Sequence, residues 1–152
     1  MKRIKTALLP SLTFLLGILV GGYLFVDTRP RSILALNKCG GTCLQPNELV
    51  GLLASVGVQN FSGVLPSVVK ETDKTVVISH PAAHARIHLV IIPKKDIKNI
   101  GEFSEDDREY LVDAFRLIRE IVAEKELVDY NVSTNGPGYQ AVTYLHFHLI
   151  AR

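Results

Sequence analysis

The chain opens with a long apolar stretch. Residues 7–26 carry no charged side chain over 20 positions, which is the length that a helix needs to cross a bilayer. Basic residues lie in the flank at 1–6, and the stretch runs into Asp27 without the small-residue site of a cleaved signal peptide. We therefore predict a single-pass transmembrane anchor at 7–26. Positive charge is nearly balanced on its two sides, so only the amino terminus and Asp27 favour a domain outside the cytoplasm.

A linker is predicted at 27–45, and hydrophobic periodicity predicts a folded domain over 46–152. Asn47 is the predicted N-cap of a short amphipathic helix. Ser104 and Asp107 resemble a capping box, and the apolar stripe that follows predicts one long helix over residues 104–126. Short β-branched or apolar runs predict strands at 75–79, 87–92, 127–134 and from 139 or 140 to 150.

The order of these elements, with strands on both sides of one long helix, predicts an α+β fold with an antiparallel sheet. The length of 152 residues is typical of a single domain. A net charge of +2 and the lack of a basic patch interleaved with aromatics argue against a nucleic-acid partner. Cys39 and Cys43 are compatible with a disulfide in an exported domain, free thiols in a reducing compartment, or half of a metal site.

Two histidines on the last predicted strand suggest its chemistry. Side chains alternate along a strand, so one face carries Gln140, Val142, Tyr144, His146 and His148. Two imidazoles at i and i+2 lie about 7 Å apart, and one phosphoryl group can contact both. Neutral histidine can attack phosphorus, while a second, protonated histidine holds the oxygens or protonates the leaving group. The same pair also fits a metal site or a surface without function.

Several segments resemble the histidine triad (HIT) family in order and spacing. The sequence YLHFHLI resembles the family signature of three histidines, each followed by an apolar residue. IHLVIIPKK resembles the strand that carries a fourth active-site histidine, and GYQAV resembles the Gly-Gln-Ser/Thr-Val stretch before the signature. The resemblance spans about residues 62–152. It implies a HIT-like antiparallel sheet with one long helix and a shorter N-terminal helix.

The resemblance also implies roles for the matching residues. His146 matches the nucleophile that forms a covalent nucleotidyl intermediate at the α-phosphate, and His148 matches the histidine that contacts phosphate and assists the leaving group. Gln140 matches the amide that hydrogen-bonds the bridging oxygen. His88 and Asn135 match substrate-binding residues of the phosphate site and the nucleotide pocket. No cofactor and no metal are predicted, and the resemblance suggests a homodimer.

The sequence departs from the family pattern at three places. Tyr144 replaces the first histidine of the signature, although its hydroxyl can still contact substrate. The sequence ISHP replaces the segment with the acidic residue that grips the ribose hydroxyls. Asp96 replaces the histidine that commonly follows Pro-Lys-Lys. His80 and His84 are interpreted first as loop residues, with substrate contact or metal ligation as alternatives.

The leading hypothesis is a hydrolase or transferase that cleaves a nucleotide, or a nucleotide-linked small molecule, through a nucleotidyl-His146 intermediate. The predicted anchor adds lipid-linked nucleotides to the candidate substrates. The second hypothesis is a non-catalytic nucleotide-binding module, favoured by Tyr144. The third is a metal-binding domain that uses His84, His88, His146 and His148.

Overall fold

The computed structural model describes residues 2–35, 43–65, 67–80 and 85–152. Its helices are α1 (Lys2–Phe25), α2 (Pro46–Asn60) and α3 (Arg108–Glu124), with 3-10 turns η2 (Ser62–Val64), η3 (Ile100–Glu102) and η4 (Glu105–Asp107). Its strands are β1 (Val68–Glu71), β2 (Thr75–Ser79), β3 (Ile87–Pro93), β4 (Tyr130–Ser133) and β5 (Phe147–Ala151). These strands form an antiparallel sheet in the order β1-β2-β3-β5-β4. The predicted α+β class is confirmed.

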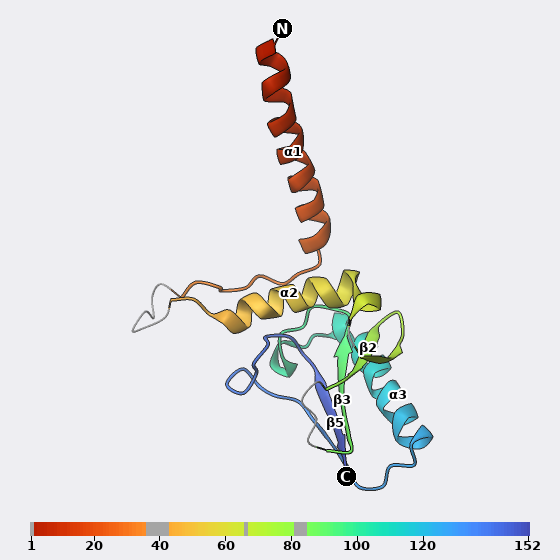
Figure 1. Ribbon diagram of the computed structural model, residues 1–152. Coiled ribbons are helices and arrows are strands. Elements are labelled where there is room, and N and C mark those ends of the chain that lie inside the picture. The colour runs from red at the N-terminus through yellow and green to blue at the C-terminus, as the bar shows by residue number, and fades with distance from the viewer. Residues whose placement is uncertain (1, 36–42, 66, 81–84) are drawn as a thin grey trace.

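The two faces of the sheet pack against different helices, because side chains alternate along each strand. On one face, Leu89, Ile91 and Leu149 pack with the buried stripe of α3 and form the main core. On the other face, Val76 and Ile92 pack with Val58 of α2. In Figure 1, α3 runs beside the strands while α2 lies across their end. The face under α2 is the one that carries the histidines.

The long helix begins with the capping box that the sequence predicts. The backbone N–H of Ser104 donates to Asp107 Oδ2 at 2.9 Å, and the Ser104 hydroxyl donates to the same oxygen at 2.8 Å. The predicted N-cap at Asn47 is wrong. The N-cap of α2 is Gln45, because Pro46 is suited to the first helical position by its fixed φ and missing N–H.

The last strand is shorter than predicted, because β5 begins only at Phe147. The N–H groups of Tyr139 and Gln140 donate to the Gly136 carbonyl in a turn. The N–H of Thr143 then donates to Asn47 O, 3.2 Å away, outside the sheet. These bonds use donors that a strand ladder would need, so residues 139–146 form an irregular segment over the end of the sheet.

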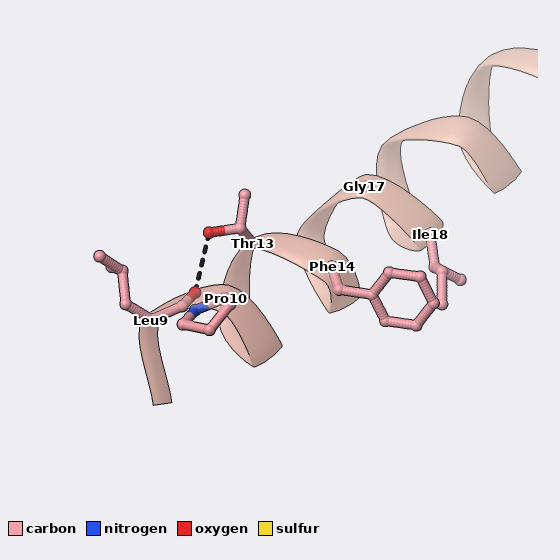
Figure 2. A pocket seen from close by; sticks show the side chains of 6 residues that line it. All are labelled: Leu9, Pro10, Thr13, Phe14, Gly17 and Ile18. Carbon is pink, nitrogen blue, oxygen red and sulfur yellow. Dashed lines mark hydrogen bonds between the residues drawn. The ribbon is translucent and has the colours of Figure 1, made fainter. Parts of the chain in front are cut away.

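Helix α1 extends away from the sheet (Figure 1). Leu9, Phe14 and Ile18 are exposed and line an open apolar groove along the helix, shown with the Thr13 hydroxyl donating to the Leu9 carbonyl in Figure 2. Within the described part of the chain, no helix combines the length and the apolar content that crossing a membrane requires. This finding contradicts the predicted transmembrane anchor at 7–26. The predicted single-pass location, with a domain outside the cytoplasm, is therefore wrong as well. Without the anchor, nothing favours a lipid-linked nucleotide as the substrate.

Part of the predicted linker is tied to the domain. The Arg29 guanidinium contacts the Asp107 carboxylate at 2.9 Å, and Arg31 pairs with the buried Asp96. In Figure 1 the segment after α1 runs alongside α2. Cys39 lies outside the described residues, so the state of the two cysteines stays a prediction.

Gly51 allows α2 to approach the irregular segment closely. A methyl group there would lie 2.5 Å from the Thr143 carbonyl oxygen, which is closer than real contacts allow. We expect Gly51→Ala to lower the free energy of unfolding by about 1–3 kcal/mol, the usual cost of overpacking. Gly57→Ala is the matched control on the same helix, because no atom lies within 4 Å of its added methyl. It should stabilise the protein by roughly 0.5–1 kcal/mol, and equal denaturation midpoints for the two variants would contradict this packing.

Candidate active site

The β2–β3 hairpin places His80 opposite His88. The two strands pair up to Ser79 and Leu89, and the His80 N–H then donates to the His88 carbonyl at 2.9 Å. Side chains opposite each other in an antiparallel pair lie on the same face. The two imidazoles stack, with ring centroids 4.1 Å apart and an interplanar angle of 3°.

Strand β5 adds His148 to this pair. β5 is hydrogen-bonded to β3, and His148 lies diagonally across from His88. His88 Nε2 and His148 Nδ1 are 3.0 Å apart, a hydrogen bond in which one nitrogen donates and the other accepts. The ring of His146 lies 5.0 Å from the His148 ring at 83°. Four imidazoles therefore lie in sequential contact on one face of the sheet.

The orientation of His146 is fixed by the backbone. His146 Nδ1 lies 2.7 Å from the Tyr144 carbonyl oxygen. A carbonyl oxygen can only accept, so Nδ1 carries the proton and Nε2 keeps its lone pair whenever the ring is neutral. The backbone carbonyl of His146 is held as well, because it accepts from the Thr134 hydroxyl at 2.8 Å. The neutral His146 ring thus keeps the lone pair of Nε2 available for a ligand.

A pocket of about 430 Å³ opens beside these rings. The histidines at its wall are His80, His146 and His148, and Asn135 adds a carboxamide. The other lining residues are apolar or aromatic: Ala54, Val58, Val90, Ile92, Tyr139, Ala141, Val142 and Tyr144. Such a mixture suits a ligand with a flat apolar group at one end and hydrogen-bond acceptors at the other.

Two of the predicted site residues are placed differently from the expectation. The Tyr144 ring lines the pocket, but its hydroxyl donates to the Pro93 carbonyl at 2.8 Å and is buried. Burial raises the pKa of this hydroxyl above its usual range, so it stays protonated. Gln140 is buried beside the pocket wall, where its amide nitrogen donates to Lys98 O at 2.9 Å. Its carboxamide is not part of the pocket lining among the described residues.

His148 is held neutral in the absence of ligand. Burial lowers its pKa to about 4, and the neighbouring imidazoles of His146, His88 and His80 add to this shift. A bound phosphate supplies negative charge that acts in the opposite direction. His148 therefore takes up a proton more readily once a phosphoryl group occupies the site.

This shift predicts a pH dependence. We expect the His148 imidazole to titrate near pH 4 in the free protein, and to titrate at higher pH with a nucleoside monophosphate bound. Because the folded state has the lower pKa, the unfolded state binds more protons between about pH 4 and 6.5, so stability rises with pH in that window and is lost as the pH falls through it. NMR titration of the ring signals measures this. A midpoint near the ordinary value of 6.5 in the free protein would contradict it.

A metal site finds no support in the described residues, because no group of three or more metal-ligating side chains there could hold an ion. His84, which the metal hypothesis uses, lies outside the described residues. Of the other three histidines in that hypothesis, His88 and His148 are hydrogen-bonded to each other. His146 is hydrogen-bonded to a backbone carbonyl.

His80 follows β2 outside any strand, as the loop interpretation predicts, but its ring stacks on His88 in the site. The hairpin pattern could have indicated this position, because pairing the strands at 75–79 and 87–92 places His80 opposite His88. Tyr139 and the α2 residues of the pocket, Ala54 and Val58, were also missed. Apolar lining residues have no pattern of their own, so only the fold identifies them.

Comparisons with known proteins find related sequences and folds. The family model described as "Scavenger mRNA decapping enzyme C-term binding" matches residues 64–152. A HIT-like protein of Chlamydia pneumoniae is 34% identical over 83 residues, which cover 53% of this chain and 76% of the relative.

Solved structures share the fold. A HIT family hydrolase from Clostridium thermocellum superimposes with a TM-score of 0.57 at 26% identity, over 64% of this chain and 89% of that one. A histidine triad nucleotide-binding protein from Candida albicans has a TM-score of 0.52 at 26% identity, over 62% and 71% of the two chains.

Proposed function

Since the chain belongs to the histidine triad family, we propose that it hydrolyses a nucleotide or nucleotide-linked small molecule at the α-phosphate. The nucleophile is His146 Nε2. The hydrolase from Clostridium thermocellum and the nucleotide-binding protein from Candida albicans support this class of reaction. A homodimer and the absence of a nucleic-acid partner stay predictions.

The observation that carries the proposal is the hydrogen bond from His146 Nδ1 to the Tyr144 carbonyl. It selects the tautomer with a free Nε2 and keeps a partner for Nδ1–H when the ring becomes positively charged. A nucleophile of this kind is effective when a second group orients it. In this chain that group is a backbone carbonyl, which the change from histidine to Tyr144 leaves in place.

The proposed reaction has two displacements. His146 Nε2 attacks the α-phosphorus, a P–N bond forms, and the bond from phosphorus to the leaving group breaks. The leaving group takes a proton from His148, which took up that proton from solvent when the negative charge of the bound phosphate raised its pKa. Water then attacks phosphorus, the P–N bond breaks, and a nucleoside monophosphate leaves with His146 restored. His148 accepts the proton of that water.

The remaining residues support the histidines or shape the pocket in this proposal. His88 supports His148 through their 3.0 Å contact, and Asn135 contacts the nucleoside. The ring of Tyr144 forms part of the apolar wall, while its hydroxyl stays with Pro93. Gln140 anchors the irregular segment to Lys98 rather than contacting the bridging oxygen.

Turnover by the full chain tests the proposal. We would incubate it with an adenosine phosphoramidate and with a dinucleoside polyphosphate in ¹⁸O-labelled water, and follow nucleoside monophosphate by mass spectrometry. The proposal predicts release of monophosphate that carries the label on its phosphoryl group. Saturable binding of a nucleotide without turnover of either substrate would favour the non-catalytic binding module instead.

A further inference from the structure

Arg31 reaches from the N-terminal segment into the body of the domain. Its side chain is only 1% exposed, and the Asp96 side chain that it contacts is 0% exposed. Arginine is rarely so buried unless its charge is paired. The Asp96 carboxylate also accepts the Arg29 N–H at 2.7 Å and a hydrogen bond from the Ser55 hydroxyl. Asp96 is thus held between the N-terminal segment and α2.

The second end of the Arg31 guanidinium contacts the irregular segment before the nucleophile. Arg31 Nη1 donates to the Thr143 carbonyl, while Nη2 donates to Asp96 Oδ1. Gly51 of α2 leaves the space for this contact, since a methyl there would lie 2.8 Å from Nη1. The two nitrogens of one rigid, planar group therefore hold a fixed separation between Asp96 and the Thr143 carbonyl.

The peptide that Arg31 holds is joined directly to the carbonyl that orients the nucleophile. Thr143 O belongs to the Thr143–Tyr144 peptide, and the next carbonyl along the chain is the Tyr144 O that accepts from His146 Nδ1. The Tyr144 side chain is fixed at the same time by its bond to Pro93. Because each peptide unit is planar, fixing one limits the directions open to the next.

We propose that Arg31 is a positioning residue for the nucleophile, acting through the Thr143–Tyr144 backbone to hold the carbonyl that selects the His146 tautomer. The expected effect on turnover rests on the proposed function, whereas the expected change in the His146 tautomer does not. Loss of Arg31 removes the donor to the Thr143 carbonyl, so only the Leu145 N–H, which donates to Ile97 O at 2.6 Å, still restrains the Tyr144–Leu145 peptide. Tyr144 O then samples more directions, and both neutral tautomers of His146 become populated.

The matched comparison is Arg31→Met with Arg29→Met in the full chain. Both arginines lie on the same docked segment and pair with buried carboxylates, but Arg29 contacts Asp107 and the Glu102 carbonyl rather than Thr143. Arg31→Lys keeps the positive charge but has a single nitrogen, so it cannot donate to Asp96 and the Thr143 carbonyl from two fixed positions. Arg31→Met combined with Asp96→Leu removes the most buried carboxylate that Arg31 pairs with, leaving Glu48 at 3.7 Å from the position of Nη1. It supplies the measurement if the single variant does not fold.

The main readout is the pair of ¹⁵N shifts of the His146 imidazole at a pH where the ring is neutral, which reports the tautomer without any turnover. Wild type and Arg29→Met should show a protonated Nδ1. Arg31→Met, Arg31→Lys and the double variant should shift toward a mixture of tautomers. In turnover assays the same three should lower kcat about 10-fold or more with KM within about 3-fold, since misplacing a reacting group affects the chemical step.

Two results would overturn the proposal: an unchanged His146 spectrum in the folded Arg31 variants, or an equal shift in Arg29→Met. A wild-type protein that turns over no substrate would count against the proposed hydrolase, while the spectra would still decide the role of Arg31.

Discussion

Replacing His146 by alanine is expected to lower kcat by about 10³-fold or more, because the nucleophile itself is removed. The side chain is half-buried at the pocket and makes one hydrogen bond, to the Tyr144 carbonyl. Its loss should therefore leave the fold and nucleotide binding largely intact. Single-turnover kinetics with an adenosine phosphoramidate, together with a binding isotherm for the product monophosphate, measures the two effects separately.

His80→Ala is the matched control for this variant, because it removes an imidazole from the same pocket wall. His80 stacks on His88 rather than facing the α-phosphate in the proposed reaction. Its loss should lower kcat by no more than roughly 10-fold, the range of a supporting contact. Equal losses from His80→Ala and His146→Ala would mean that no single imidazole is the nucleophile.

Replacing Asp107 by alanine is expected to destabilise the fold by about 3 kcal/mol, because it removes several charge-assisted hydrogen bonds to a buried carboxylate. The Asp107 side chain is 0% exposed and contacts Arg29 at 2.9 Å and Lys95 at 3.0 Å. It also accepts both hydrogen bonds of the Ser104 capping box. One carboxylate therefore joins the N-terminal segment, the end of β3 and the start of α3.

The pH dependence of stability provides an independent check on Asp107. Burial by itself raises the pKa of this carboxyl, but hydrogen bonds from Lys95, Ser104 and Arg29 outweigh burial and hold the pKa well below its ordinary value of 3.8. The unfolded state consequently binds more protons below about pH 4, and the stabilisation is lost as the pH falls. Wild type should lose stability in that range more steeply than Asp107→Ala.

Asp106→Ala is the control, since Asp106 is an exposed acid in the same first turn. Surface substitutions of this kind change stability by less than about 0.5 kcal/mol. Chemical denaturation at neutral pH compares the three proteins. A midpoint for Asp107→Ala that matches Asp106→Ala would show that the buried cluster does not stabilise the fold.

The elements with a regular hydrophobic periodicity were predicted correctly from the sequence. The stripe at Leu111, Ile118 and Val122 gave α3, and the run at 87–92 gave β3, because burial of one face determines both patterns. The HIT-like fold expected from the resemblance is confirmed by the solved structures of the family. The irregular segment at 139–146 was misread as strand, since alternation continues there while its backbone N–H groups bond elsewhere.

The sequence predicted which histidines come together, but only part of the geometry around them, and the chemistry of the site stays a prediction. The sheet register brings His88 and His148 together, and His146 lies beside His148 just before β5. The Tyr144 hydroxyl and the Gln140 amide bond to backbone carbonyls of Pro93 and Lys98 instead of facing the pocket. Such contacts join residues about 50 positions apart, and no local pattern in the sequence encodes them. The same holds for the pairing of Arg31 with Asp96.

The most direct test of the account is to trap the covalent intermediate. The full chain would be mixed with an adenosine phosphoramidate, quenched in alkali within milliseconds to seconds, and digested for peptide mass spectrometry. A nucleotidyl-His146 intermediate predicts an adenylyl group on the peptide that contains His146. Fragmentation should locate the group on that residue, and His146→Ala should lack it. Turnover of the substrate by wild type with no adduct at any time point would contradict a nucleotidyl-His146 intermediate and point to direct attack by water.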